Sequence, residues 1–212
     1  MKLDLHIHTN ASYDSQTTPQ EAVNTALRRM LSGIAVTDHD SMANIQIIRQ
    51  LAPPELLVIP GAEYSTDCGH VLALFCDEFY SPTPIKLAQL APFVRQRGGI
   101  LIAAHPRNTL TQCQANAQYL DGFEAANAHY PRGNTIIKKI AARQGKIVTA
   151  GSDAHIPNAI GRNTIKLPDD TPLTLEAVKA ALLARKQTIP RNPCNFVRWA
   201  ARKLRKKLRK QP

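Results

Sequence analysis

The sequence predicts an α/β fold built around a parallel sheet. Short apolar segments alternate with stretches of helical periodicity, and at least six of the apolar segments have the length of a buried strand. Continuous apolar strands that alternate with helices are typical of parallel sheets covered by those helices. The alternation by itself fits a closed or distorted barrel and an open doubly wound sheet equally well.

The strands are expected where apolar residues run together. The segment from Lys2 to His8 alternates apolar with polar residues, which is the periodicity of a strand. The other expected strands are residues 34–36, 56–59, 71–75, 100–104, 123–126 and 147–150.

Helical patterns lie between most of these strands. Thr18, Pro19 and Glu21 combine a capping box with a proline at the first helical position, and they predict the start of a helix. Further helices are expected over residues 42–52, 84–97 and 134–144 and after Thr174. Pro92 is expected to break or restart the helix in which it lies.

Length and composition indicate a globular protein of about one domain. The chain has 212 residues, of which 43% are hydrophobic and 20% charged, and this argues against a disordered protein. No uncharged apolar run has the roughly 18 residues of a transmembrane helix, and no secretory signal is visible. We therefore expect a cytoplasmic protein. Its four cysteines lack the CxxC spacing and are expected to be reduced.

The net charge of +11 is concentrated at the C-terminus. Eight lysines and arginines and no acid lie between Arg198 and Lys210, and the rest of the chain carries only +3. We expect a domain over residues 1–190 and a basic amphipathic tail over residues 191–212. The tail segment 197–212 has three alternative roles: it contacts short nucleic acid, lies peripherally on an anionic membrane surface, or packs on the domain.

Six of the seven histidines stand at the ends of expected strands. They are His6, His8, His39, His70, His105 and His155. Carboxylates stand close to them in the chain, namely Asp14, Asp38, Asp40, Glu63 and Asp153. Because residues that follow parallel strands converge on one face, these side chains are expected to meet in one pocket. A single histidine there would more often be structural, but this combination predicts a polynuclear site for zinc, manganese or iron.

Several short motifs resemble those of the PHP (polymerase and histidinol phosphatase) domain. They are His6-Ile7-His8-Thr9, Asp14, Thr37-Asp38-His39-Asp40, Gly61-Ala62-Glu63, His105-Pro106 and Gly151-Ser152-Asp153-Ala154-His155. The motifs follow the order of that family and cover most of the chain. The resemblance implies a distorted (β/α)7 barrel that holds two or three divalent metal ions, as in the small stand-alone phosphoesterases of the family.

The resemblance also implies a set of metal ligands. It assigns the first metal to His6, His8, Glu63 and Asp153. It assigns the second metal to Glu63, His70 and His105, with Glu63 bridging the two ions. It assigns the third metal to Asp14, His39 and His155. Many members have a histidine where this chain has Asp14, so the third position is expected to be the weakest. Glu124 and Asn127 match an acid-then-asparagine segment of the family.

The activity implied is that of a metal-dependent phosphoesterase. It would hydrolyse a small phosphorylated substrate, of the nucleotide or sugar phosphate class, with a hydroxide that bridges two metals. No serine or cysteine nucleophile motif is visible, which favours direct attack by water. Asp40 and His129 are candidate proton donors, although Asp40 could instead support a metal ligand and His129 could lie on the surface. Arg107 and Arg162 are candidate phosphate ligands or, alternatively, solvated arginines.

Two other functions fit parts of the sequence. The basic tail is compatible with an exonuclease or nucleotidase that acts on short oligonucleotides. A metal-stabilised interaction module without catalytic activity is the alternative from a different class. The full set of candidate ligands argues against that module, since a degenerate domain would have lost some of them.

Overall fold

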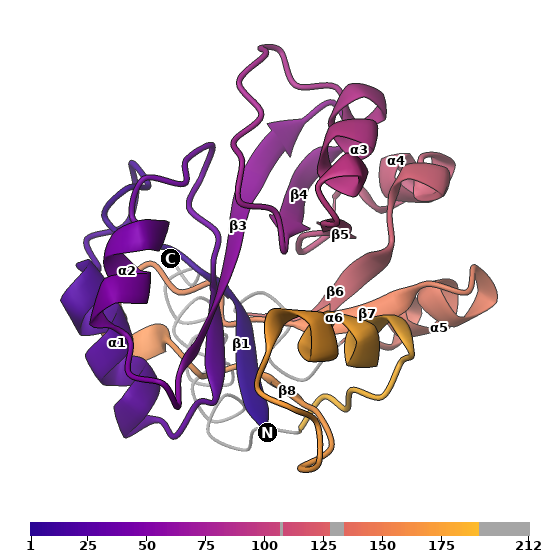
Figure 1. The fold of residues 1–212 in the computed structure, drawn as a ribbon. Coiled ribbons are helices and arrows are strands. Elements are labelled where there is room, and N and C mark those ends of the chain that lie inside the picture. Colours follow the sequence, from indigo (N-terminus) through magenta and orange to yellow (C-terminus); the bar gives the residue numbers. More distant parts are fainter. Residues whose placement is uncertain (107, 128–133, 191–212) are drawn as a thin grey trace, which may run out of the picture.

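The computed structural model describes residues 1–106, 108–127 and 134–190. Its strands are β1 (Lys2–Ile7), β2 (Gly33–Val36), β3 (Leu57–Thr66), β4 (Gly69–Leu74), β5 (Ile100–Ala103), β6 (Gly122–Ala126), β7 (Ile147–Ala150) and β8 (Ile165–Lys166). Its α-helices are α1 (Pro19–Arg28), α2 (Ile45–Leu51), α3 (Leu87–Gln96), α4 (Leu110–Ala115), α5 (Thr135–Arg143) and α6 (Leu175–Leu183) (Figure 1). Two short 3-10 helices are η1 (Ala117–Tyr119) and η2 (Pro157–Ala159).

The strands form a distorted barrel. Strands β1 to β7 are neighbours in chain order, and the short β8 pairs antiparallel with the start of β1. The end of β1 meets the segment after β7, where Ile7 pairs with Ala154 and the His8 N–H donates to the Ala154 carbonyl at 2.9 Å. This contact closes the sheet and confirms the distorted barrel of seven main strands. The open doubly wound alternative is wrong.

The expected parallel sheet has one exception among its main strands, because β4 runs antiparallel to both β3 and β5. Strand β3 continues through Pro60 and Gly61 to Thr66, and β4 begins three residues later. So short a connection permits a hairpin but not the long crossover that a parallel pair needs. As a result, the start of β4, with His70, lies at the same end of the barrel as the carboxyl ends of the parallel strands.

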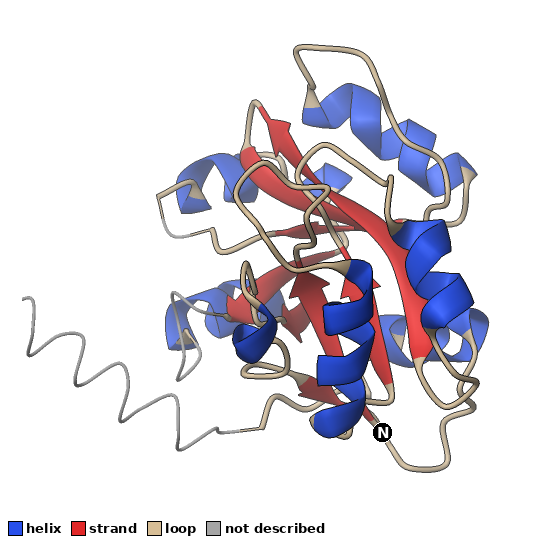
Figure 2. Ribbon diagram, turned by 90° about the vertical axis from the view of Figure 1, so that its left-hand side faces the viewer, coloured by secondary structure: helices blue, strands red, loops and turns tan. Residues whose placement is uncertain are grey.

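The helices cover the outside of the barrel and its amino-terminal end. Helices α1 and α2 lie together on one side, and α3, α4 and α5 on another (Figures 1 and 2). Helix α6 differs, because its Val178 and Leu182 belong to one buried cluster with Leu3 near the start of β1 and Leu74 at the end of the antiparallel β4. Helix α6 therefore packs at the amino ends of the parallel strands, opposite to the end that carries the histidines.

Helix α3 passes through Pro92 without a break, contrary to the expectation. Proline lacks the N–H that would bond to the carbonyl four residues earlier, here that of Ala88. Both Pro92 and Ala88 are exposed, so water can satisfy the carbonyl that the proline leaves without a partner. The apolar face of the helix, with Leu90 and Val94, stays buried against the barrel.

Three of the four cysteines are free and buried, as expected for reduced structural thiols: Cys68, Cys76 and Cys113. Burial raises the pKa of the Cys68 thiol to about 11, which keeps it protonated. Cys194 lies outside the described residues, as does the tail at residues 191–212. None of the helices in the described part of the chain is both long enough and apolar enough to span a membrane.

Candidate metal centre

Four side chains from three distant parts of the chain converge at the carboxyl end of the barrel. His6 and His8 come from the end of β1, Glu63 from β3 and Asp153 from the segment after β7, and each contributes one donor atom to a common cluster. The Nε2 atoms of His6 and His8 are 3.0 Å apart and lie 3.0 and 3.2 Å from Glu63 Oε2. The same nitrogens lie 3.5 and 3.4 Å from Asp153 Oδ1. Donors about 2.1 Å from a tetrahedral zinc ion would be about 3.4 Å apart, so the cluster has the size of such a site.

Hydrogen bonds fix both histidines in the form that binds metals. His6 Nδ1 lies 3.1 Å from Glu124 Oε1, which can only accept, so Nδ1 carries the hydrogen. Ser12 Oγ donates its hydrogen to Asp38 Oδ1 at 3.0 Å and therefore accepts from His8 Nδ1 at 3.0 Å. In both rings Nε2 is thus the nitrogen that faces the other ring and two carboxylates, and it becomes a metal donor once it has given up its proton. A divalent cation fits this set of two imidazole nitrogens and two carboxylates, in which it would take the place of the histidine protons.

Glu63 extends this cluster toward a second group. Its other oxygen, Oε1, lies 3.1 Å from His70 Nδ1 and 3.0 Å from His105 Nε2. The two oxygens of one buried carboxylate therefore face different sets of histidines, which is the geometry of a bridging ligand. His39 Nδ1 also lies 3.4 Å from Glu63 Oε2. Glu63 thus contacts both histidines that the resemblance assigns to the second metal, although the group of mutually close donor atoms around His70 consists of His39, Glu63 and His70.

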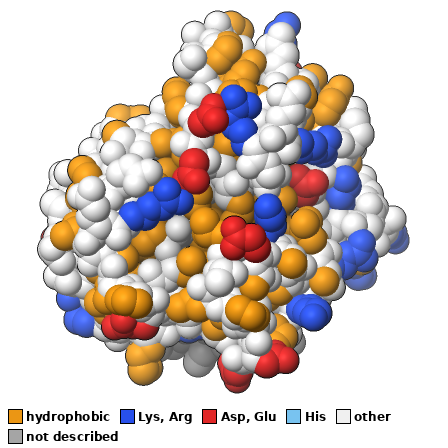
Figure 3. All heavy atoms as spheres, viewed as in Figure 1, with side chains coloured by type: hydrophobic (Ala, Val, Ile, Leu, Met, Phe, Trp, Pro, Cys, Tyr) orange, Lys and Arg blue, Asp and Glu red, His pale blue; other side chains and the backbone are white. Residues whose placement is uncertain are grey.

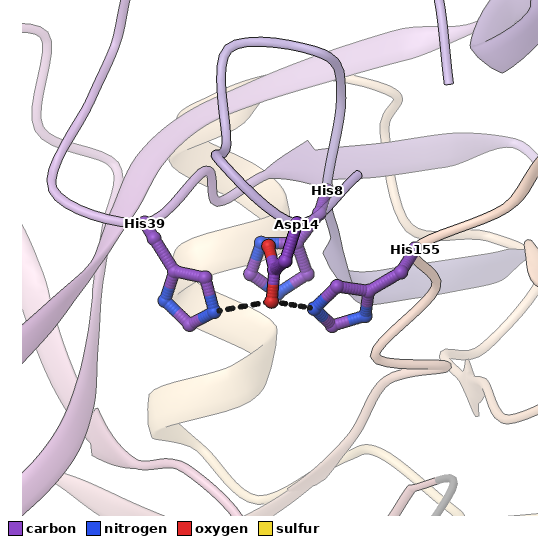
Figure 4. A group of neighbouring side chains, drawn as sticks. All are labelled: His8, Asp14, His39 and His155. Atoms are coloured by element: carbon purple, nitrogen blue, oxygen red, sulfur yellow. Dashed lines mark ion pairs between the residues drawn. The ribbon is translucent and has the colours of Figure 1, made fainter. Parts of the chain in front are cut away.

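A third group lies on the solvent side of the first and consists of His8, Asp14, His39 and His155. Asp14 Oδ2 lies between two rings, 3.0 Å from His155 Nε2 and 3.6 Å from His39 Nε2 (Figure 4). The Asp14 side chain is 33% exposed, whereas His8 is fully buried. Because His8 belongs to both the first and the third group, the two groups are joined through a single imidazole.

The charges within the centre stabilise each other strongly. Burial disfavours the charged form of His6, but the carboxylates of Glu63, Glu124 and Asp153 outweigh it and raise its pKa well above the usual range. For Glu63, burial opposes ionisation, yet contacts with His6, His105 and other histidines hold its pKa well below the usual range. Asp153 is likewise kept ionised by a pKa below its usual value. The carboxylates are thus available as anionic ligands at neutral pH.

Sequence reasoning missed part of the network that supports the ligands. Ser12 links Asp38 to His8 and also accepts the backbone N–H of His39 at 2.8 Å. Asp38 therefore orients His8 through Ser12 rather than by direct contact. Only the proximity of Ser12 to His8 in the chain could have suggested it. The fully buried Asp4 accepts the N–H groups of Ser152 at 2.8 Å and Gly161 at 2.7 Å, and burial raises its pKa to about 6.

Glu124 supports the centre from β6. Besides His6 Nδ1, it accepts the His105 N–H at 2.9 Å and the Asn127 side-chain amide at 2.7 Å, both at Oε2. His105 and Asp153 have positive φ values of 28° and 52°. This region of backbone conformation is uncommon outside glycine, and it turns the chain sharply at two strand ends where ligands must face inward.

The remaining candidate site residues are Asp40, Arg162, Arg107 and His129. Asp40 is exposed, and its Oδ1 accepts the Ser65 N–H at 3.1 Å beside the metal groups. Arg162 is half-buried in the segment after η2, and its role as a phosphate ligand stays a prediction. Arg107 and His129 lie outside the described residues.

Removing His8 is expected to cost more metal than removing Asp14. The variant His8→Ala takes a donor from two groups, whereas Asp14→Ala takes one partly exposed donor from the third group alone. We expect Asp14→Ala to lose at most one ion per chain and His8→Ala to lose more, by elemental analysis of the two proteins purified in parallel. Equal loss from both variants would contradict this division of the ligands.

Comparisons with known proteins agree with this fold. A family model described as PHP-associated matches residues 131–187. No curated protein sequence matches the chain. A two-domain protein from Bacteroides vulgatus, with a predicted PHP-like metal-dependent phosphoesterase, is similar over 91% of this chain with a TM-score of 0.77 and 18% identity. The chain spans 65% of the length of that protein.

Two further solved structures are similar. PsfC from Pseudomonas syringae matches over 98% of both chains, with a TM-score of 0.70 and 19% identity. Histidinol phosphate phosphatase from Lactococcus lactis, in complex with zinc, L-histidinol and phosphate, matches over 76% of this chain and 90% of its own, with a TM-score of 0.50 and 16% identity. These structures show that the chain shares their fold, and the PHP-associated family model matches its part from residue 131 to residue 187.

Proposed function

We propose that this protein is a metal-dependent phosphoesterase that hydrolyses a small phosphorylated substrate of the nucleotide or sugar phosphate class. The observation that carries the proposal is the sharing of Glu63, whose two oxygens face separate sets of histidines at the carboxyl end of the barrel. Likeness to the zinc- and phosphate-containing histidinol phosphate phosphatase adds support. Two or three divalent ions, of zinc, manganese or iron, are the proposed cofactors.

In the proposed reaction, the candidate ligands would hold the metal ions and Asp40 would donate a proton. His6, His8, Glu63 and Asp153 would hold one ion, Glu63 with His70 and His105 a second, and Asp14, His39 and His155 a third. Bound divalent ions lower the pKa of water and stabilise negative charge on the transferred phosphoryl group. In hydrolysis the oxygen of water bonds to phosphorus, the ester P–O bond breaks and the leaving alcohol takes a proton. Asp40, at the edge of the metal groups, is the proposed donor of that proton within the described residues.

A panel of three substrates tests this function. We expect the manganese-loaded protein to hydrolyse p-nitrophenyl phosphate, and a chelator to abolish the activity. Hydrolysis of bis-p-nitrophenyl phosphate or of short RNA in preference to the monoester would favour the exonuclease alternative, for which the basic tail is the motivation. A protein that binds its metals but cleaves none of the three would be an interaction module, and the proposal would be wrong.

Deleting residues 197–212 is expected to leave turnover of a small phosphomonoester within about twofold of the full-length value, because every proposed ligand lies before the tail. The two proteins should then be compared for binding to anionic vesicles and to short RNA at low and high salt. Binding that depends on the tail and weakens with salt identifies its partner. A large fall in turnover with fold and metals intact would show that the tail helps to build the active site.

A further inference from the structure

A hollow of about 680 Å³ lies between the tip of β3 and the segment of residues 79–86. Polar residues line part of it, namely Asp40, Ser65, Thr66, Asp67, Ser81, Thr83 and Lys86, and Phe79, Tyr80, Pro84 and Ile85 form its apolar wall. Its volume falls within the usual range for small-molecule sites, and aromatic and aliphatic side chains make up much of its wall. None of the metal ligands described above lines it, so the hollow is a separate feature of the molecule.

The hollow adjoins the metal centre through Asp40 and Ser65. Asp40 directly follows His39, and its N–H donates to the Glu63 carbonyl at 3.0 Å. Ser65 lies two residues beyond Glu63 on β3, so the two side chains project on the same side and their Cα atoms are about 7 Å apart. The Ser65 N–H donates to Asp40 Oδ1 at 3.1 Å, which joins these two lining residues. A group bonded to a phosphoryl held at the metals could therefore extend into the hollow.

The aromatic wall of the hollow is held in place. The Phe79 ring is 40% exposed and stacks on the buried Tyr64 ring, with centroids 5.5 Å apart. The Tyr64 hydroxyl accepts the Tyr80 N–H at 2.8 Å, and the Tyr80 ring packs against Phe93. An exposed phenyl ring fixed in this way presents a preformed apolar face, which reduces the entropy cost of binding.

The segment that carries this wall is also tied to the tip of β3. Ile85 pairs with Thr66 as an isolated β-bridge, and the Asp67 N–H donates to the Ile85 carbonyl at 3.2 Å. Asp67 Oδ1 in turn accepts the N–H of Leu87, the first residue of α3. The wall is thus attached at both the strand and the helix, and the shape of the hollow does not depend on a ligand.

We propose that this hollow is the leaving-group subsite and that it selects phosphomonoesters of alcohols that carry an aromatic or alicyclic ring. The inference rests on the proposed function, because it assumes that the phosphoryl group binds at the metals. The ring packs against Phe79, Pro84 and Ile85, while Asp40 and Ser65 lie nearest the ester oxygen. A short polar alcohol would leave this apolar wall in water and gain nothing from it.

Tyr13 offers a competing position for such a ring. It is 86% exposed and stacks on His39 with ring centroids 5.3 Å apart, on the side of the third metal group. A ligand on Tyr13 would be covered from one side only, whereas the hollow surrounds a ring with several side chains. The hollow is therefore favoured, and Tyr13 becomes an arm of the test.

The experiment compares two phosphonates that cannot be hydrolysed, 2-phenylethylphosphonate and propylphosphonate, by calorimetry on the zinc-loaded full-length chain. We expect the ring-bearing compound to bind roughly tenfold more tightly, since it buries the additional apolar area. Phe79→Ala should reduce this preference to roughly threefold or less, as should Ser81→Trp, which fills the hollow from its rim. Leu183→Ala, on the exposed side of α6 at the opposite end of the barrel, is the matched control and should keep the preference.

The outcomes separate this proposal from the proposed function. Equal binding of the two phosphonates by the wild-type chain, or a preference that survives both Phe79→Ala and Ser81→Trp, overturns the subsite. A preference lost in Tyr13→Ala but kept in Phe79→Ala moves the ring to the third metal group and also overturns it. If the preference behaves as expected while 2-phenylethyl phosphate is not hydrolysed, the subsite stands and the phosphoesterase function fails. Hydrolysis of 2-phenylethyl and propyl phosphates with equal kcat/KM and no binding preference leaves the function standing without the subsite.

Discussion

Replacing Glu63 with glutamine is expected to remove bound metal and activity together. The Glu63 carboxylate has five histidine nitrogens within 3.4 Å, two at Oε1 and three at Oε2. Glutamine has nearly the same shape, but it is neutral, and one of its two terminal atoms is an NH₂ donor that cannot accept or ligate. The variant therefore loses the negative charge that two ions would share and one of the two donor atoms.

The expected fall in turnover follows from the stabilisation of charge that bound metal ions provide. Their stabilisation of charge is worth several kcal/mol, so we expect turnover to fall at least roughly a hundredfold. Metal content should fall below half of the wild-type value in elemental analysis of the same preparations. Glu55→Gln is the matched control, because Glu55 is exposed and precedes the amino end of β3, opposite to the end of the barrel that carries the proposed ligands. A Glu63→Gln protein with wild-type metal content would remove Glu63 from the bridging role.

Much of the candidate metal centre could be predicted because the positions of its proposed ligands follow from topology. His39, His105 and Asp153 come just after the ends of apolar strands, and parallel strands bring such positions to one face. His70 does not follow this rule, since it stands near the start of a strand. It reaches the same face only because β4 is antiparallel, which alternating apolar segments could not reveal. The family resemblance placed His70 where periodicity alone could not.

The elements that escaped prediction lack the signals on which sequence reading depends. Helix α4 (Leu110–Ala115) has polar residues at half of its positions, and only Cys113 is buried, so it shows little apolar periodicity. Strand β8 is two residues long. Pro60 and Gly61 look like the end of a strand, yet β3 continues beyond them because the hairpin partner β4 supplies pairing as far as Thr66. For β8 and the end of β3, pairing with a neighbouring strand outweighs the local preference of the residues.

The closure of the barrel depends on a residue whose importance only the structure shows. Gly151 follows β7, and its backbone lies against β1 at His6. A Cβ atom at position 151 would overlap His6 Cβ and would lie 2.6 Å from the His6 backbone nitrogen and 2.9 Å from its Cα. These atoms belong to the backbone or are rigidly attached to it, so no side-chain rotation can make room. The strands therefore approach closely because position 151 has no side chain.

We expect Gly151→Ala to separate β1 from the segment after β7 and to displace His6 from its ligand position. Overpacking of a rigid contact of this kind costs about 3 kcal/mol, which for a chain of this size lowers Tm by about 6–12 °C. Measuring Tm with a chelator present excludes the contribution of bound metal, and elemental analysis then reports whether His6 still contributes to a site. Gly98→Ala is the control, because Gly98 has a positive φ of 73° but lies beyond the end of α3, with only the Lys179 Nζ near its added Cβ. The Gly98→Ala control should lower Tm only by the smaller cost of a strained backbone, and it should keep the full metal content. A Gly151→Ala protein with unchanged Tm and metal content would show that the barrel closes without this contact.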